Sequence, residues 1–122
     1  MKSLKFPVVY VDFTSPDPLM MLAHKLSEQL FGGIEFIGEN SGIWDEVPAV
    51  RLARRFLGLS VELGGTDGRY TLQVDAPEFP WPLVPETERT SASVDISSFV
   101  AHLLGQIPGV ELSVDGWSGK PQ

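Results

Sequence analysis

Apolar and polar residues follow two different periods along this chain, which indicates both strands and helices. Residues 6–13 are nearly continuously apolar and rich in β-branched and aromatic side chains, a pattern typical of an interior strand buried on both faces. A helical period then begins, and its apolar stripe contains Leu19, Leu22, Ala23, Leu26 and Leu30. We expect this first helix to start with Asp17 as N-cap and Pro18 in the first turn, and to end at Gly32-Gly33.

Residues 48–57 predict a second helix. Read with the helical period, the arginines of this segment share one arc and the apolar residues share the other. Read as a strand, the arginines would fall on both faces. The helical interpretation therefore has Pro48 in its first turn and Gly58 at its end, with the basic arc formed by Arg51, Arg54 and Arg55.

The remaining patterns predict strands and one more helix. Residues 60–64 and 69–75 alternate apolar and polar side chains around a turn, so they form a hairpin in which Asp67-Gly68 supplies positive φ angles. Short strands are expected at 34–37, 90–94 and 110–114. Between the last two, Asp95 caps a helix whose buried arc is expected to contain Ile96, Phe99, Val100, Leu103, Leu104 and Ile107.

Together these elements follow the order β-α-β-α-β-β-(β)-α-β. Helices interspersed with a central hairpin predict an α+β fold, with a mixed sheet of about five or six strands and three helices. The length of 122 residues is that of one domain. We expect a single domain over residues 1–115 and a flexible C-terminal tail over residues 116–122.

Composition narrows the classes of partner. Nine Lys and Arg face sixteen Asp and Glu, which gives a formal charge of −7. Such a charge repels phosphate backbones and anionic lipid surfaces, so neither nucleic acid nor a membrane is an expected partner, whereas a basic protein is. The first residues lack the apolar stretch of a signal sequence and no segment is long enough to span a bilayer, so we expect a cytoplasmic protein.

Catalytic chemistry has little support in the sequence. The absence of cysteine excludes disulfides and thiolate chemistry, and no nucleophile motif or phosphate-binding loop is present. His24 and His102 fall on outward helix faces without a second ligand, so we expect neither a metal nor a cofactor. A small enzyme built on Asp12 and Asp17 is an alternative, although a strand end and a helix cap also explain these two residues.

Two loops combine large aromatic residues with carboxylates, as protein contact surfaces often do. The alternative is that their aromatic side chains fold inward and anchor the loops. The second loop is stiffened by prolines, which lowers the entropy lost on binding. The candidate contact residues are Glu39, Trp44, Asp45 and Glu46 in the first loop and Asp75, Glu78, Phe79, Trp81, Glu86 and Glu88 in the second.

In size, acidity, lack of cysteine, α+β order and acidic-aromatic loops such as Trp44-Asp45-Glu46, the chain resembles the small acidic immunity proteins that protect bacteria from toxins. The resemblance is to the class as a whole and carries over no individual residue. It implies a non-enzymatic inhibitor whose acidic loops cover the active site of a basic toxin. The alternative function of a different kind is a structural or adaptor subunit of a secretion or phage-type assembly.

Overall fold

The structure is a computed structural model of the chain, and it describes residues 6–39, 42–44, 46–76 and 93–112. The predicted tail at 116–122 and most of the proline-rich loop therefore lie outside the described residues. The elements, in chain order, are β1 (Phe6–Thr14), α1 (Leu19–Leu30), β2 (Phe36–Ile37), β3 (Ala49–Leu52), β4 (Ser60–Thr66), β5 (Arg69–Asp75), β6 (Ser93–Asp95), α2 (Ser97–Leu104) and β7 (Glu111–Leu112).

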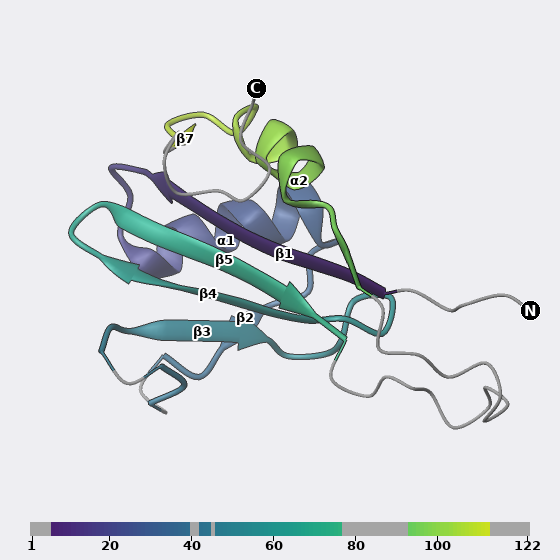
Figure 1. Cartoon of the computed structure of the whole chain (residues 1–122). Coiled ribbons are helices and arrows are strands. Elements are labelled where there is room, and N and C mark those ends of the chain that lie inside the picture. Colours follow the sequence, from purple (N-terminus) through teal and green to yellow (C-terminus); the bar gives the residue numbers. More distant parts are fainter. Residues whose placement is uncertain (1–5, 40–41, 45, 77–92, 113–122) are drawn as a thin grey trace, which may run out of the picture.

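The predicted α+β class with a mixed sheet is confirmed. Within the described residues, seven strands form one sheet in the order β2-β3-β4-β5-β1-β6, and β7 pairs with the end of β1 that is opposite to the end paired with β6 (Figure 1). Among these seven strands, every pairing is antiparallel except that of β1 with β6. The β4–β5 hairpin has the predicted turn, since both Asp67 and Gly68 have positive φ, at 55° and 82°.

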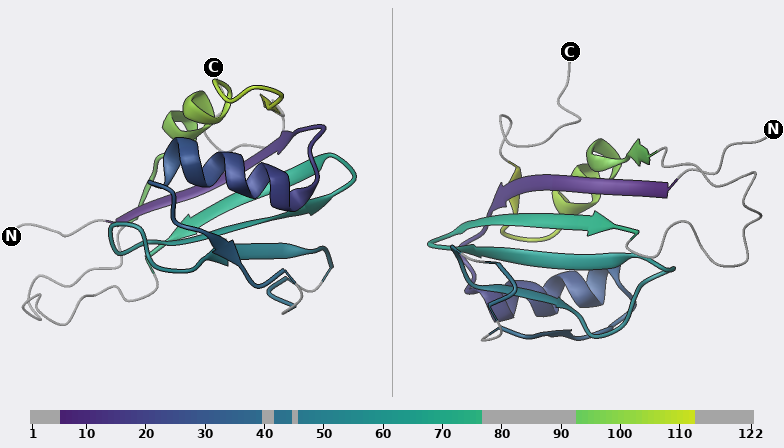
Figure 2. Two further views of the ribbon diagram at one scale, coloured as in Figure 1. Left: turned by 180° about the vertical axis from the view of Figure 1, so that it is seen from behind. Right: turned by 60° about the horizontal axis from the view of Figure 1, so that its bottom comes forward.

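Helix α1 covers one face of the sheet, as the view from behind shows (Figure 2). Its predicted apolar stripe is buried except for Leu30, which is half-buried, and Leu22, Ala23 and Leu26 are at most 1% exposed. They pack against the inward side chains of the sheet, which include Val11, Phe13, Val50, Leu63 and Leu72. The N-cap is Pro18 rather than the predicted Asp17, whose carboxylate contacts Lys25 of α1 instead.

The second predicted helix is wrong, because residues 49–52 form β3. This strand pairs with β4 and places Ala49, Val50 and Leu52 in buried positions, with Arg51 outward. Arg54 follows in an exposed bend and Arg55 is exposed just after it, so the three arginines do not form one helical arc. The spacing of apolar residues and arginines in residues 48–57 fits a helix only by coincidence. What decided the structure was the edge of β4, whose backbone groups needed an antiparallel partner.

The prediction that β1 is buried on both faces is also wrong. Val9, Val11 and Phe13 are at most 4% exposed, but Tyr10 between them is 49% exposed. Consecutive strand side chains point to opposite faces. Val9, Val11 and Phe13 belong to the core cluster that also contains the buried residues of α1. No helix of the described residues lies on the face of Tyr10, Asp12 and Thr14, and we call it the open face.

Helix α2 lies beside β1 and corrects a third expectation. Its buried residues are Ser97, Ala101 and Leu104, which share one helical stripe, whereas Phe99 is 62% exposed instead of buried. The N-cap is Ile96 rather than the predicted Asp95, although Asp95 Oδ1 accepts a hydrogen bond of 2.8 Å from the Ser97 N–H at the helix start.

The turn between β3 and β4 carries backbone strain. Phe56 and Leu59 exchange two backbone hydrogen bonds of 2.9 Å around a two-residue turn formed by Leu57 and Gly58. Both turn residues have positive φ, 53° and 80°. Glycine adopts this conformation freely, but a leucine does so at a cost of about 1–2 kcal/mol. Leu57 gains nothing from packing in return, since it is 85% exposed.

Replacing Leu57 with asparagine should therefore stabilise the protein. Asparagine tolerates positive φ, so we expect Leu57→Asn to raise the free energy of unfolding by about 1 kcal/mol. Urea-induced unfolding followed by circular dichroism would measure this. Leu57→Ala is the matched control, because it removes the side chain but keeps the strain, and should change stability by less than about half as much. Equal stabilisation by both variants would contradict the assigned strain.

Candidate functional site

The strand register places the outward side chains of the open face in rows across the sheet. Antiparallel residues that lie opposite each other point to the same face. One row joins Asp12, Thr71 and Gly64 of β1, β5 and β4. The next row joins Tyr10, Gln73 and Glu62 in the same order. These two rows therefore present one aromatic ring and two carboxylates on three adjacent strands, and Arg51 of β3 lies opposite Glu62 on the same face.

Trp44, which comes from the loop between β2 and β3, lies on this face above Gly64. Its indole N–H donates a hydrogen bond of 2.8 Å to Glu62 Oε1. A Cβ atom on Gly64 would overlap two carbons of the indole ring, so the ring can approach the strand only because residue 64 is glycine. Trp44 is half-buried and anchors its loop to the sheet.

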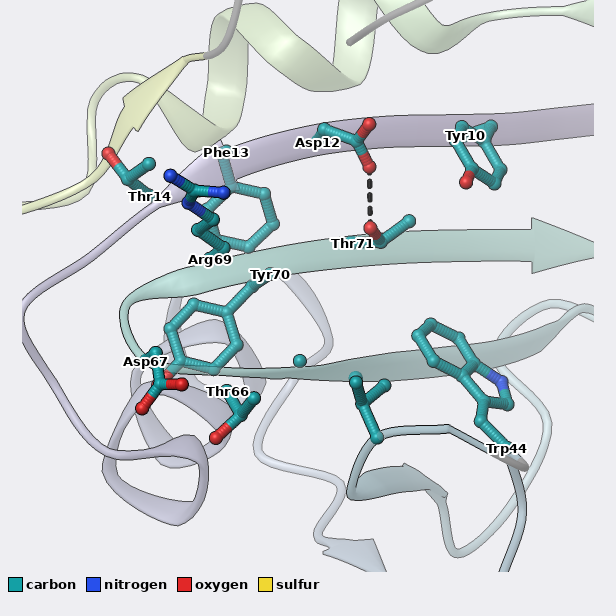
Figure 3. A pocket seen from close by; sticks show the side chains of 13 residues that line it. Tyr10, Asp12, Phe13, Thr14, Trp44, Thr66, Asp67, Arg69, Tyr70 and Thr71 are labelled. Carbon is teal, nitrogen blue, oxygen red and sulfur yellow. Dashed lines mark hydrogen bonds between the residues drawn. The ribbon is translucent and has the colours of Figure 1, made fainter.

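A groove of about 840 Å³ runs along the open face next to Trp44 (Figure 3). Tyr10 and Asp12 of β1 line one part of it, Trp44 another, and Thr71 of β5 lies in the row between them. The Thr71 hydroxyl donates a hydrogen bond of 2.5 Å to Asp12 Oδ1. Asp67, Arg69 and Tyr70 line the part of the groove near the β4–β5 turn. Aromatic surface and carboxylates thus meet in one concavity.

The structure describes some of the predicted contact residues. Glu39 and Glu46 are exposed in the loop that carries Trp44, and Asp75 is exposed at the end of β5. The other six predicted residues lie outside the described residues: Asp45, Glu78, Phe79, Trp81, Glu86 and Glu88.

Sequence reasoning missed Tyr10 and Thr71 as members of the site. A strand buried on both faces implies a buried Tyr10, which is the reason that this interpretation does not predict its exposure. A signal was available, because Asp12 and Thr14 are polar and alternate with Val11 and Phe13. That alternation is typical of a strand with one face toward solvent.

Asp12 and Asp17 do not share a site. Asp12 contacts Thr71 on the open face. Asp17 lies on the helix side, where its Oδ2 is 2.5 Å from Lys25 Nζ of α1 and its backbone oxygen accepts a hydrogen bond of 2.6 Å from the Tyr70 hydroxyl. Tyr70 and Thr71 are consecutive strand residues, so they hold the two aspartates on opposite faces.

In residues 6–39, 42–44, 46–76 and 93–112, no cluster of three or more histidines or carboxylates could hold a metal ion. His24 and His102 are both exposed, and His102 Nε2 lies 3.0 Å from the side-chain amide of Gln106. No helix within these ranges has the length and apolar character needed to cross a bilayer.

Tyr70 gives the fold a pH dependence. Burial raises the pKa of the Tyr70 hydroxyl above its ordinary value of 10.0, and the charges of Asp17 and Asp67 raise it further. The neutral hydroxyl is favoured in the folded state, so its contribution to stability is complete below pH 10. The contribution is lost as the pH rises from there through the higher pKa of the folded protein.

The unfolding free energy should therefore fall above pH 10, and less steeply in Tyr70→Phe than in the parent protein. The variant has no ionisable group at this position, but it loses a hydrogen bond worth about 1 kcal/mol at neutral pH. Urea unfolding at a series of pH values from neutral to strongly alkaline would measure both effects. Parallel stability curves for the two proteins would show that Tyr70 does not cause the alkaline loss.

The contact of Trp44 with Gly64 can be tested by a double-mutant cycle. Gly64→Ala alone should destabilise the protein by about 1–3 kcal/mol, because the added methyl group displaces the indole. In a Trp44→Ala background the same substitution should cost at least about 1 kcal/mol less, since the displaced ring is absent. Chemical denaturation of the four proteins gives the coupling energy. Additive effects would mean that Trp44 does not lie on Gly64 in solution.

Comparison with known proteins assigns the site to no family. No family model matches the chain, and no curated protein or solved structure is significantly similar to it. The candidate site is therefore defined by its geometry: the open face of the sheet, on which Tyr10, Asp12 and Trp44 surround a groove.

Proposed function

We propose that this chain is a protein-binding inhibitor of the immunity-protein type, which docks a basic partner protein on the open face of its sheet. The observation that carries the proposal is the groove on that face, where a tyrosine that is 49% exposed and a half-buried tryptophan lie beside a carboxylate. Tyr and Trp are enriched among the residues that contribute most to protein–protein binding. The proposal assigns no catalytic step to this chain.

The fixed positions of the side chains on the open face support a role in protein binding. Tyr10, Asp12 and Thr71 belong to two long strands that pair over six residues. Trp44 is held by its hydrogen bond to Glu62 and by its contact with Gly64. Side chains already fixed in place lose little conformational entropy on binding, so more of the interaction energy appears as affinity.

Charge supports a basic partner. The chain carries a formal charge of −7, and Glu39, Glu46 and Asp75 are exposed near the loop and strand ends around the sheet. Carboxylates at the rim of an interface speed the encounter with a positively charged protein and reject acidic ones. If that partner is a toxin with a basic active site, docking this face on it would exclude the substrate by steric and electrostatic blockage.

An adaptor or structural subunit remains the second proposed function. It is favoured by two exposed apolar side chains on a different part of the surface, Phe99 of α2 at 62% and Val94 of β6 at 41%. Exposed apolar residues beside an edge strand suit stable assembly with other subunits. Sedimentation analysis distinguishes the two functions, because a concentration-independent oligomer favours assembly and a monomer favours inhibition.

The proposed inhibitor should lose its partner when the acidic rim is reversed. We expect the double variant Glu46→Lys and Asp75→Lys to bind the partner at least about tenfold more weakly, with most of the change in the association rate. Affinity capture from the source cells supplies candidate partners, and surface plasmon resonance with each purified candidate measures the rates.

The control is the double variant Glu28→Lys and Glu35→Lys, which makes the same change in charge beside α1, where both residues line a small cavity. A partner that tolerates the control but not the rim variant fits the proposal. A captured protein that binds both variants equally well does not use this face. For a toxin partner, co-expression with this chain should restore growth, and the rim variant should restore it less.

A further inference from the structure

We infer that the groove on the open face is a binding site for a guanidinium group, supplied by an arginine side chain of the partner protein. This inference rests on the proposed function, because it names the chemical group that the open face recognises. It follows from the placement of three side chains: the carboxylate of Asp12, the indole of Trp44 and the phenol ring of Tyr10.

The register fixes how far apart these groups lie. Asp12, Thr71 and Gly64 are directly opposite one another on β1, β5 and β4, and Trp44 lies on Gly64. Neighbouring strands are about 4.8 Å apart, so the backbones of β1 and β4 are separated by about 10 Å. A planar cation seated above Thr71 is then within reach of the carboxylate on one side and the indole on the other.

Tyr10 supplies a second aromatic surface. It lies two residues from Asp12 on the same face of β1, or about 7 Å along the strand. Trp44 extends in the same direction, because its indole nitrogen reaches Glu62 in the row of Tyr10. A cation is attracted to an aromatic face when it lies within about 6 Å of the ring centre. Both rings can satisfy this condition for one bound cation.

The carboxylate of Asp12 is oriented to act as the counter-ion of a bound guanidinium group. Its Oδ1 is occupied by the Thr71 hydroxyl, which orients the carboxylate. Within the described part of the chain, no hydrogen-bond donor reaches its Oδ2. The half-buried position weakens solvent screening, so an ion pair formed here is stronger than one at an exposed site.

A guanidinium group fits this site better than an ammonium group. It is planar and weakly hydrated, it stacks on aromatic rings, and its N–H groups can bind a carboxylate at the same time. Arg69 lines the same groove but lies one row away, where it is opposite Thr14 (Figure 3). The positive charge of Arg69 lowers the affinity of the groove for a second cation. Removing that charge should therefore strengthen binding of the guanidinium group, whereas removing Asp12 or Tyr10 should weaken it.

The test uses the purified protein and N-acetyl-arginine amide, followed by two-dimensional amide NMR. Titration should shift the signals of Asp12, Gly64 and Thr71 and the indole N–H of Trp44, with a dissociation constant in the millimolar range expected for a single side chain. N-acetyl-lysine amide should bind more weakly, and N-acetyl-glutamine amide should cause no comparable shifts.

Amino-acid substitutions separate the aromatic contact of Tyr10 from the ionic contact of Asp12. Tyr10→Leu and Asp12→Asn should each weaken binding about fivefold, while Tyr10→Phe keeps the aromatic face and should bind as the parent does. Arg69→Gln should strengthen binding about twofold or more, because it removes a like charge. Glu28→Gln, on the α1 side, makes the same charge change as Asp12→Asn and should have no effect. Amide spectra of the unliganded variants verify that each one is folded.

Absence of shifts in the groove, or equal binding by Asp12→Asn and the parent, would overturn the inference. That result would leave the proposed function standing if the purified partner still binds the parent protein and fails to bind the rim variant. If instead the arginine probe binds the groove but Tyr10→Leu binds the partner normally, the site exists and the partner does not use it, which also overturns the inference as stated.

Discussion

The hydrogen bonding of strand β1 on both of its edges is the constraint on which the rest of the structure depends. This strand lies inside the sheet, and its buried N–H and C=O groups must all find partners. β5 satisfies one edge over six residue pairs. The other edge is satisfied in pieces, by β6 near Phe6–Val8 and by β7 at Phe13 and Thr14.

Ser97 completes this second edge between the two short strands. Its hydroxyl accepts a hydrogen bond of 3.0 Å from the Tyr10 N–H, at a point where β6 has ended and β7 has not begun. Ser97 is fully buried as the first residue of α2, so the helix starts where the strand needs an acceptor. This hydrogen bond fixes the C-terminal part of the described chain to β1. It also holds β1 in place, so that Tyr10 and Asp12 are presented on the open face.

The sequence was sufficient to predict elements whose signal is local. The α1 stripe and the β4–β5 hairpin have strong periods and typical turn residues, so their structure agrees with the prediction. β3 was missed because its partner strand, and not its own pattern, determines its conformation. Its turn also lacks the usual signal, since leucine replaces the asparagine or aspartate expected before Gly58.

The candidate site was harder to predict than the fold, because it depends on register. The acidic neighbours of Trp44 indicate a candidate contact residue, but they do not decide whether its side chain anchors the loop. The structure shows that Trp44 is an anchor that still lines a groove. The groove itself joins residues from β1, β5 and the β2–β3 loop, which no local pattern connects. Only the pairing of the strands brings Asp12 and Gly64 into one row.

Gly64 affects both the stability of the sheet and the geometry of the candidate site. A glycine inside a strand lowers stability, because it has no side chain to pack and loses more conformational entropy on folding. Here the cost is offset by the indole of Trp44, which occupies the space that a Cβ would fill and covers the exposed backbone. The same packing holds one aromatic wall of the groove at a fixed position. A larger residue at 64 would satisfy strand propensity and, by displacing Trp44, remove that wall of the groove.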